Sequence, residues 1–148
     1  MYKLISTSLG IGYIKGGGTI ASIFCCVCLY YTQACGINNS WISVLIALAI
    51  IAVGVYAANK VEEHWGKDNY RVVIDEVAGM YITMMFIPVS ITTLIAGLIL
   101  FRLFDIIKPL YIKELEKLPG GVGVMMDDVL AGIYANLVLQ LAIIVSLL

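Results

Sequence analysis

Five of the ten acidic residues in this 148-residue chain fall at three places whose spacing suggests chemistry. They are the pair Asp75-Glu76, the single Asp105 and the pair Asp127-Asp128. Helix N-capping, worth about 1 kcal/mol per cap, explains one acid of each pair but not both. Clustered carboxylates repel one another, and a hard divalent cation such as Mg²⁺ relieves the repulsion while also binding substrate phosphate oxygens. Such an ion polarises a phosphoryl oxygen and lowers the pKa of a bound water, so the acids predict metal-assisted chemistry at phosphate.

Two basic residues and a glycine-rich turn could hold the phosphate itself. Arg102 and Lys108 lie three residues to either side of Asp105, so on a helix a base can lie beside this acid and meet an anion. The segment 16–19, Gly-Gly-Gly-Thr, precedes an apolar stretch. A glycine-rich turn that leads into a helix exposes backbone N–H groups to an anion, and a flexible turn is the alternative.

Histidine and cysteine chemistry is largely excluded. The single histidine, His64, lies in a charged stretch typical of a solvated loop, so neither a histidine-rich metal site nor a two-histidine phosphatase mechanism is available. Cys25, Cys26 and Cys28 lie in an apolar helical segment, where cysteine behaves as a small hydrophobic residue. No cysteine is followed six residues later by the arginine that cysteine phosphatases require, and the four thiols predict no disulfide framework.

The elements that carry these residues are typical of a membrane protein. The chain is 61% hydrophobic and 13% charged, with a mean hydropathy of +1.00, and so holds about half the charge of a soluble domain. Residues 41–58 and 129–148 carry no charge, and a helix needs ~18–20 such residues to cross ~30 Å of hydrocarbon. A very apolar soluble helical bundle is the alternative. The net charge of −1 argues against a nucleic-acid partner, and the length allows a single domain over residues 1–148.

The apolar segments predict an all-α bundle of about five membrane helices. These cover residues 18–35, 41–60, 73–87, 91–108 and 126–148. All nineteen charged residues lie in the stretches 3–15, 60–76, 102–117 and 127–128. Five crossings would place these stretches on one face, which the positive-inside rule makes cytoplasmic, with the C-terminus on the other side.

The third and fourth helices are predicted to be short. Twelve residues separate Glu76 from the uncharged turn at Pro88, which is ~18 Å of helix, and the return from Ser90 to Arg102 is equally long. If the turn reaches the far surface, these charges lie inside the hydrocarbon, where a lone charge costs ~2.5–3.5 kcal/mol unless it pairs or binds an ion. If the hairpin stops short, they lie at the interface. Either arrangement places them beside lipid headgroups.

One polar stripe follows the last helix. Asp128, Gly132, Asn136 and Gln140 recur every four residues and therefore share a face. Such a stripe should face the bundle, where asparagine and glutamine hydrogen-bond across helices. We therefore expect Asn136 and Gln140 to be structural.

Three stretches of the sequence resemble the motifs of one enzyme family. They are V-I-D-E-V-A-G-M over residues 73–80, F-R-L-F-D-I-I-K-P over 101–109 and G-G-V-G-V-M-M-D-D-V-L-A-G over 120–132. Their order and spacing are similar, over about residues 10–140, to those of bacterial phosphatidylglycerophosphatase A. The family's glycine-rich start, Pro-Gly-Thr followed by Gly-Ser, is kept at Gly18, Thr19 and Ser22, whereas Gly17 replaces the proline and Ala21 the second glycine.

The resemblance implies a Mg²⁺-dependent phosphomonoesterase of the bacterial inner membrane that converts phosphatidylglycerophosphate to phosphatidylglycerol at the cytoplasmic face. It implies Glu76, Asp127 and Asp128 as metal ligands. Asp75 and Asp105 would orient water or complete the ligand shell, and both water attack and an aspartyl-phosphate intermediate are compatible with this set. The residues expected to bind the substrate are Gly18, Thr19, Ser22, Arg102, Lys108, Gly121 and Gly123.

Two other membrane functions are alternatives. A phosphatidyl-transferring enzyme would also bind Mg²⁺ through aspartates, but its D-G-x-x-A-R continuation is missing because Val129 and Leu130 follow Asp127-Asp128. A small ion or proton carrier would need acids along a path to the far side, whereas here the acids stop on one face. No pattern in the sequence specifies an oligomeric state.

Overall fold

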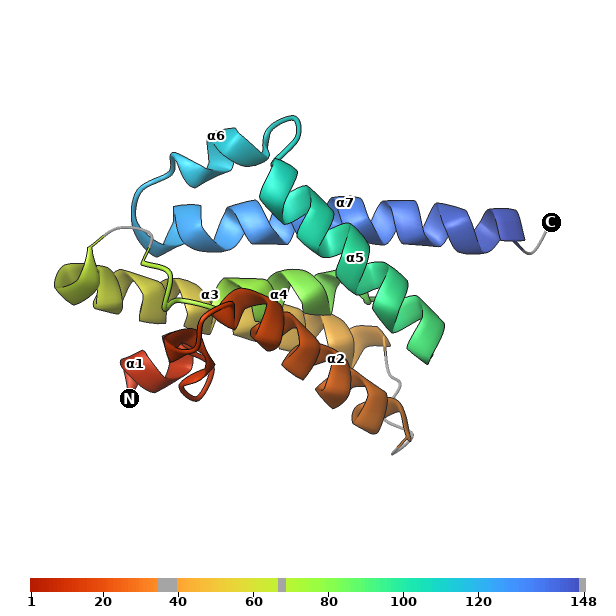
Figure 1. Ribbon diagram of the computed structural model, residues 1–148, viewed down its shortest axis with the longest axis horizontal. Coiled ribbons are helices and arrows are strands. Elements are labelled where there is room, and N and C mark those ends of the chain that lie inside the picture. Colours follow the sequence, from red (N-terminus) through yellow and green to blue (C-terminus); the bar gives the residue numbers. More distant parts are fainter. Residues whose placement is uncertain (35–39, 67–68, 147–148) are drawn as a thin grey trace.

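The computed structural model describes residues 1–34, 40–66 and 69–146, and every regular element in these ranges is helical (Figure 1). The five principal helices are α2 (Gly17–Ala34), α3 (Ser40–Trp65), α4 (Ile74–Thr83), α5 (Ile91–Ile107) and α7 (Gly120–Ser146). Three elements of one turn or little more accompany them, namely α1 (Tyr2–Ser6), η1 (Ile11–Tyr13) and α6 (Ile112–Glu116). The predicted all-α bundle is confirmed, while the predicted helix ends at residues 35 and 148 lie outside the described residues.

The last helix begins earlier than the sequence suggested, at Gly120 rather than near residue 126. The backbone N–H of Gly121 donates to Asn59 Oδ1 on α3 at 2.7 Å, and a Cβ at Gly121 would overlap the carbonyl oxygen of Val55. This close contact with α3 offsets the low helix propensity of glycine. Asp127 and Asp128 consequently lie about two turns inside α7, so N-capping does not explain this pair.

Helix α4 is the centre of the bundle, because it packs against α2, α3, α5 and α7. Gly79 lies directly against the Phe101 ring of α5 and the backbone carbonyl of Asp128 on α7, and Gly132 lies against the backbone of Gly79. Small residues of this kind let helix backbones approach closely. The contact holds the first turn of α4 beside the aspartates of α7.

The end of α4 is held by the polar stripe of α7. Asn136 Nδ2 lies 3.2, 2.9 and 2.8 Å from the carbonyl oxygens of Ile82, Thr83 and Met85, and Gln140 Nε2 donates to Asn136 Oδ1 at 2.7 Å. Carbonyl groups at the end of a helix lack intrahelical donors, and the Asn136 side chain supplies a donor to these carbonyl groups. The prediction that Asn136 and Gln140 face the bundle is confirmed, and α4 ends at Thr83 instead of residue 87.

Three helices in the described part of the chain are long and apolar enough to cross a membrane, namely α2, α3 and residues Gly120–Val145 of α7. Helix α4, with 10 residues, and α5, with 17, are shorter than the ~20 residues of a full crossing, as the position of the charges predicted. In Figure 1, α1 and α6 lie toward one end of the bundle and the C-terminal end of α7 lies at the other. The charged segments are thus grouped at one end.

Candidate active site

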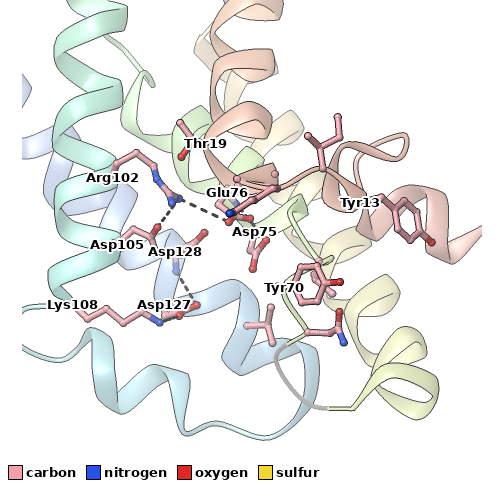
Figure 2. Close-up of a pocket in the computed structure, with 18 residues that line it drawn as sticks. Tyr13, Thr19, Tyr70, Asp75, Glu76, Arg102, Asp105, Lys108, Asp127 and Asp128 are labelled. Carbon is pink, nitrogen blue, oxygen red and sulfur yellow. Dashed lines mark hydrogen bonds and ion pairs between the residues drawn. The ribbon is translucent and has the colours of Figure 1, made fainter.

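The charged end of the bundle contains an open cavity of about 580 Å³ (Figure 2). It is bounded by the turn before α2, the segment before α4, the first turn of α4, the end of α5 and the first turns of α7. Its described lining comprises residues 13–19 together with Asn69, Tyr70, Val72, Asp75, Glu76, Arg102, Asp105, Lys108, Val124, Asp127 and Asp128. All five carboxylates and both bases that the sequence singled out therefore line one cavity.

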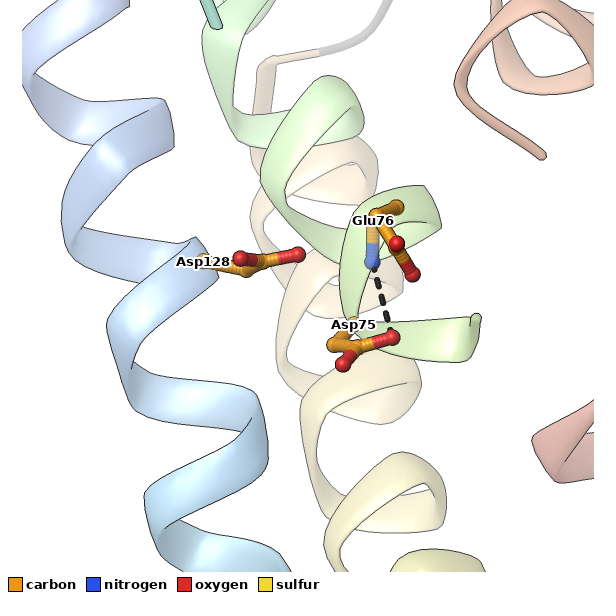
Figure 3. Close-up of side chains that lie close together, drawn as sticks. All are labelled: Asp75, Glu76 and Asp128. Atoms are coloured by element: carbon orange, nitrogen blue, oxygen red, sulfur yellow. Dashed lines mark hydrogen bonds between the residues drawn. The ribbon is translucent and has the colours of Figure 1, made fainter. Parts of the chain in front are cut away.

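Three of the carboxylates form a tight trio, which is shown in Figure 3. Asp75, Glu76 and Asp128 each offer an oxygen, and these oxygens all lie within 4.8 Å of one another. Asp75 Oδ1 accepts the backbone N–H of Glu76 at 3.1 Å. Glu76 Oε2 and Asp128 Oδ2 are buried and have no hydrogen-bond donor among the described residues. Buried acceptors normally have partners, so these two oxygens are the ones in the trio that could bind a cation.

The N-terminal segment positions the first two members of the trio. The N–H of Val73, the residue before α4, donates to the carbonyl oxygen of Ser6 at 2.8 Å. Gly12 lies against the carbonyl of Arg71, and Gly18 lies directly against the carboxylate of Glu76. A side chain at either glycine would overlap its neighbour, so the chain approaches the site closely here.

Arg102 bridges two acids from the end of α5. Its Nη1 lies 2.7 Å from Asp105 Oδ2, one helical turn away, and 3.8 Å from Glu76 Oε1 on α4. These three side chains are each less than one quarter exposed, so their charges are only partly screened by solvent. The guanidinium therefore lies between Glu76 and Asp105, as the dashed lines in Figure 2 show.

Lys108 follows α5 directly and adopts φ +48°, a left-handed conformation that is uncommon for a residue other than glycine. Its Nζ lies 2.8 Å from Asp127 Oδ2 and 3.3 Å from Glu116 Oε2. Burial disfavours the charged lysine, but the hydrogen bonds and charges of Asp127 and Glu116 outweigh it and raise the pKa of Lys108 above its ordinary value. Lys108 is therefore a fixed cation in the wall of the cavity.

The two adjacent aspartates of α7 have different partners in the structure. Asp127 was expected to be a metal ligand, but it is paired with Lys108, and Asp75 takes its place in the closest trio. Asp105 is paired with Arg102. Asp105 and Asp127 thus each form a short ion pair with a base, whereas Glu76 is the member of the trio that reaches a cation, Arg102, at 3.8 Å.

Three residues expected at the substrate do not line this cavity. Ser22 is buried and its hydroxyl donates to the Gly18 carbonyl at 3.0 Å within α2. Gly121 packs on α3, and Gly123 packs against the carbonyl oxygen of Leu118. The two glycines lie where a helix or a loop approaches closely, and none of the three residues lines the cavity. Gly18 and Thr19 do line it.

The sequence analysis missed the wall of the cavity that lies across from Lys108. Tyr13, Lys15, Asn69 and Tyr70 line this wall, from η1, the turn before α2 and the segment before α4. Aromatic and basic residues within the charged stretches were the available signal, because such residues are typical of a membrane interface.

The match to a family model decides the assignment, since the model of "Phosphatidylglycerophosphatase A" covers residues 4–143. The chain belongs to the phosphatidylglycerophosphatase A family. The resemblance of the three motifs is thereby confirmed, and the chain is an enzyme of a phosphatase family rather than a carrier. The three motifs supply the trio and the two bases of the cavity, together with glycines at which the helices pack closely.

Three curated relatives are named as lipid phosphatases, two of them as phosphatidylglycerophosphatase A. A Bacteroides thetaiotaomicron protein with the provisional name phosphatidylinositol-3-phosphatase is 38% identical over 94% of this chain and 91% of its own length. Proteins named phosphatidylglycerophosphatase A from Haemophilus influenzae and Escherichia coli are 43% and 35% identical. Those two alignments cover 58% and 60% of this chain and only 55% and 54% of the relatives. No solved structure matches the chain.

Proposed function

We propose that this protein hydrolyses the terminal phosphomonoester of a glycerophospholipid headgroup, with phosphatidylglycerophosphate as substrate and phosphatidylglycerol as product. The observation that carries the proposal is a carboxylate trio with two unpartnered buried oxygens, in one cavity with Arg102 and Lys108. Membership of the family supports the same chemistry. A cavity at the end of membrane-spanning helices suits a lipid whose headgroup lies at the interface while its tails stay in the bilayer.

The cofactor that best fits the trio is Mg²⁺. Its donors are all carboxylate oxygens, which are hard ligands, and Mg²⁺ usually combines one or two carboxylates with waters and phosphate oxygens. Asp75, Glu76 and Asp128 would hold the ion, while Asp127 is better assigned to Lys108 because of their 2.8 Å ion pair. When bound, the ion would polarise a phosphoryl oxygen and lower the pKa of a bound water.

The two bases would hold the phosphate. Arg102 has five N–H donors, and Asp105 engages only one edge of the guanidinium, so the remaining donors are available to phosphate oxygens. Lys108 would add a second positive charge on the same side. Asp105 and Asp127 then act as positioning residues, because each holds one of these bases in place. Thr19, exposed in the cavity wall, offers a hydroxyl donor.

We place the reaction at the cytoplasmic face of a bacterial inner membrane. All nine lysines and arginines belong to the stretches that include or flank the cavity, and the cytoplasmic side of membrane proteins is enriched in these residues. A cysteine substituted for Lys113, in a variant without native cysteines, should react with an impermeant thiol reagent only after the cell membrane is permeabilised. Reaction in intact spheroplasts would reverse the orientation.

Phosphatidylinositol 3-phosphate is a second candidate substrate. The Bacteroides relative covers nearly the whole chain, and its name describes a phosphatase acting on this lipid. Both candidates carry a phosphomonoester on a glycerophospholipid headgroup, so the same arrangement of trio and bases serves either.

Phosphate release by the purified protein tests the proposal. Each lipid would be supplied in neutral detergent micelles, with and without EDTA, followed by addition of Mg²⁺. We expect release from at least one lipid, its loss in EDTA and in Asp128→Asn, and its recovery with Mg²⁺. Glu114→Gln, an exposed acid paired with Lys117 outside the cavity, is the matched control and should retain activity. No release from either lipid refutes the function, and release that survives both EDTA and Asp128→Asn refutes the metal assignment.

A further inference from the structure

The cavity has two walls of opposite electrostatic character. The inner wall carries all five carboxylates and is only partly neutralised by Arg102 and Lys108. The outer wall is formed by residues 13–16, Asn69, Tyr70 and Val72, and Lys15 is its only charged lining residue in the described part of the chain. A volume of about 580 Å³ is also that of a site for a whole headgroup rather than for a single phosphate.

Arg71 holds the two tyrosines of the outer wall in place. Its guanidinium carbon lies 5.8 Å from the centre of the Tyr13 ring and 5.3 Å from that of Tyr70, and its Nε donates to the Tyr70 hydroxyl at 3.3 Å. It also lies 5.5 Å from the Trp65 ring, which contacts Tyr13 edge-on at 6.1 Å. Two segments that are distant in sequence are thus joined by cation–π contacts. The outer wall is therefore a preorganised, positively charged surface.

Both candidate lipids share a chemical feature that matches two walls. In phosphatidylglycerophosphate and in phosphatidylinositol 3-phosphate, three carbon atoms separate the phosphomonoester from the phosphodiester that joins the headgroup to diacylglycerol. The monoester is the reacting group and belongs at the inner wall. The diester is a second anion that needs a cation and hydrogen-bond donors beyond the acid cluster.

We propose that Lys15, on the wall that Tyr13 and Tyr70 help to form, provides a second phosphate subsite that binds this phosphodiester. The inference rests on the proposed function and adds the residues that select its substrate. Figure 2 shows Tyr13 and Tyr70 across the cavity from Lys108, with the trio between them. Both tyrosines are more than half exposed, and Figure 2 draws their hydroxyl groups directed away from the trio, so the positive charge of Lys15 is what this wall offers to the diester. The subsite distinguishes a headgroup phosphomonoester from phosphatidic acid, which has no phosphodiester.

The kinetic test uses Lys15→Gln, the conservative Lys15→Arg, and Lys113→Gln as a control at an exposed lysine outside the cavity. In neutral micelles, we expect Lys15→Gln to raise KM for the preferred lipid about fivefold, the upper range for an exposed ion pair, with kcat within twofold. The inhibition constant of short-chain phosphatidylglycerol, which carries only the diester, should rise equally. Inhibition by inorganic phosphate should not change, and Lys15→Arg should restore both constants.

Three results would overturn the subsite. The first is an unchanged KM in Lys15→Gln, and the second is an equal rise of KM in Lys113→Gln. The third is an equal weakening of inhibition by inorganic phosphate in Lys15→Gln, which would place Lys15 at the monoester instead. A binding measurement separates this inference from the proposed function. Short-chain phosphatidylglycerol should change the fluorescence of Trp65 in a Trp41→Phe background, and Lys15→Gln should weaken that binding about fivefold even if no phosphate is released. Unaltered binding in Lys15→Gln refutes the subsite independently of catalysis.

Discussion

Replacing Asp128 by asparagine should make the protein more stable and inactive at the same time. Asp128 is 4% exposed, and its Oδ2 has no donor among the described residues. Two unit charges 4.8 Å apart repel by ~3.5 kcal/mol at an effective dielectric constant of about 20. Asp128 takes part in two such pairs, with Asp75 and Glu76. Protons bound by the cluster and the charge of Arg102 reduce this repulsion, so we expect the substitution to raise the free energy of unfolding by ~1–3 kcal/mol without metal.

Thermal unfolding in detergent measures this effect, with EDTA and with Mg²⁺. In EDTA, Asp128→Asn should unfold at a higher temperature than the wild type, by about 2–4 °C per kcal/mol for a chain of this size. In Mg²⁺ the difference in unfolding temperature between the two proteins should become smaller or change sign, because the ion stabilises only a protein that binds it. Phosphate release should fall by about 100-fold or more, since groups that merely orient a metal ligand are already worth about 10–100-fold.

The sign of the change in unfolding temperature distinguishes relief of repulsion from a general destabilisation of the bundle. Asp127→Asn is the matched control, because Asp127 lies in the same cavity but is paired with Lys108 at 2.8 Å. That substitution should lower the unfolding temperature and preserve the stabilisation by Mg²⁺. A lower unfolding temperature for Asp128→Asn in EDTA, or a full response of this variant to Mg²⁺, would refute the account of the trio.

Three further substitutions test the parts that support the site. Gly18→Ala places a methyl group on the Glu76 carboxylate, so kcat should fall at least about tenfold, and unchanged kcat would show that the contact is unimportant. Lys108→Met leaves Asp127 nearly buried and unpaired, which should cost ~1–3 kcal/mol in a denaturation experiment. The double variant with Asp127→Asn should recover most of that loss, and strictly additive losses would contradict the pairing. Asn136→Leu removes the side-chain donor at the end of α4 and should lower the free energy of unfolding by ~1–3 kcal/mol. The kcat measured at low temperature should be retained. A variant that loses kcat at unchanged stability would assign Asn136 to the chemistry.

Much of the fold followed from hydropathy and from the position of the charges. Uncharged apolar runs gave the long helices, and the charges at Glu76 and Arg102 indicated that the hairpin of α4 and α5 is short. The four-residue spacing of Asn136 and Gln140 placed both on the face of α7 that meets α4. These features depend on residue type and helical period, which the sequence contains directly.

The roles of the small residues were harder to predict. Gly121, Gly123 and Ser22 belong to motifs of the family, and the resemblance to the family implied that they bind the substrate. In the structure they permit close packing, and the same packing lets α7 start at Gly120 despite its glycines. A glycine at a helix contact and a glycine at a ligand look alike in sequence, because both are selected for the absence of a side chain.

The sequence by itself determined that this is an apolar helical bundle with an acid-rich site at one end, since residue types and their positions fix hydropathy and charge. Only the tertiary structure decided which acids act together. Adjacent residues on a helix point about 100° apart, so Asp127 and Asp128 are directed to different sides. The packing of α7 against α4 directs Asp128 to Asp75 and Glu76, while Asp127 meets Lys108 at the end of α5. The pairing of these acids depends on how three helices pack, so it cannot be predicted from the spacing of residues within one helix.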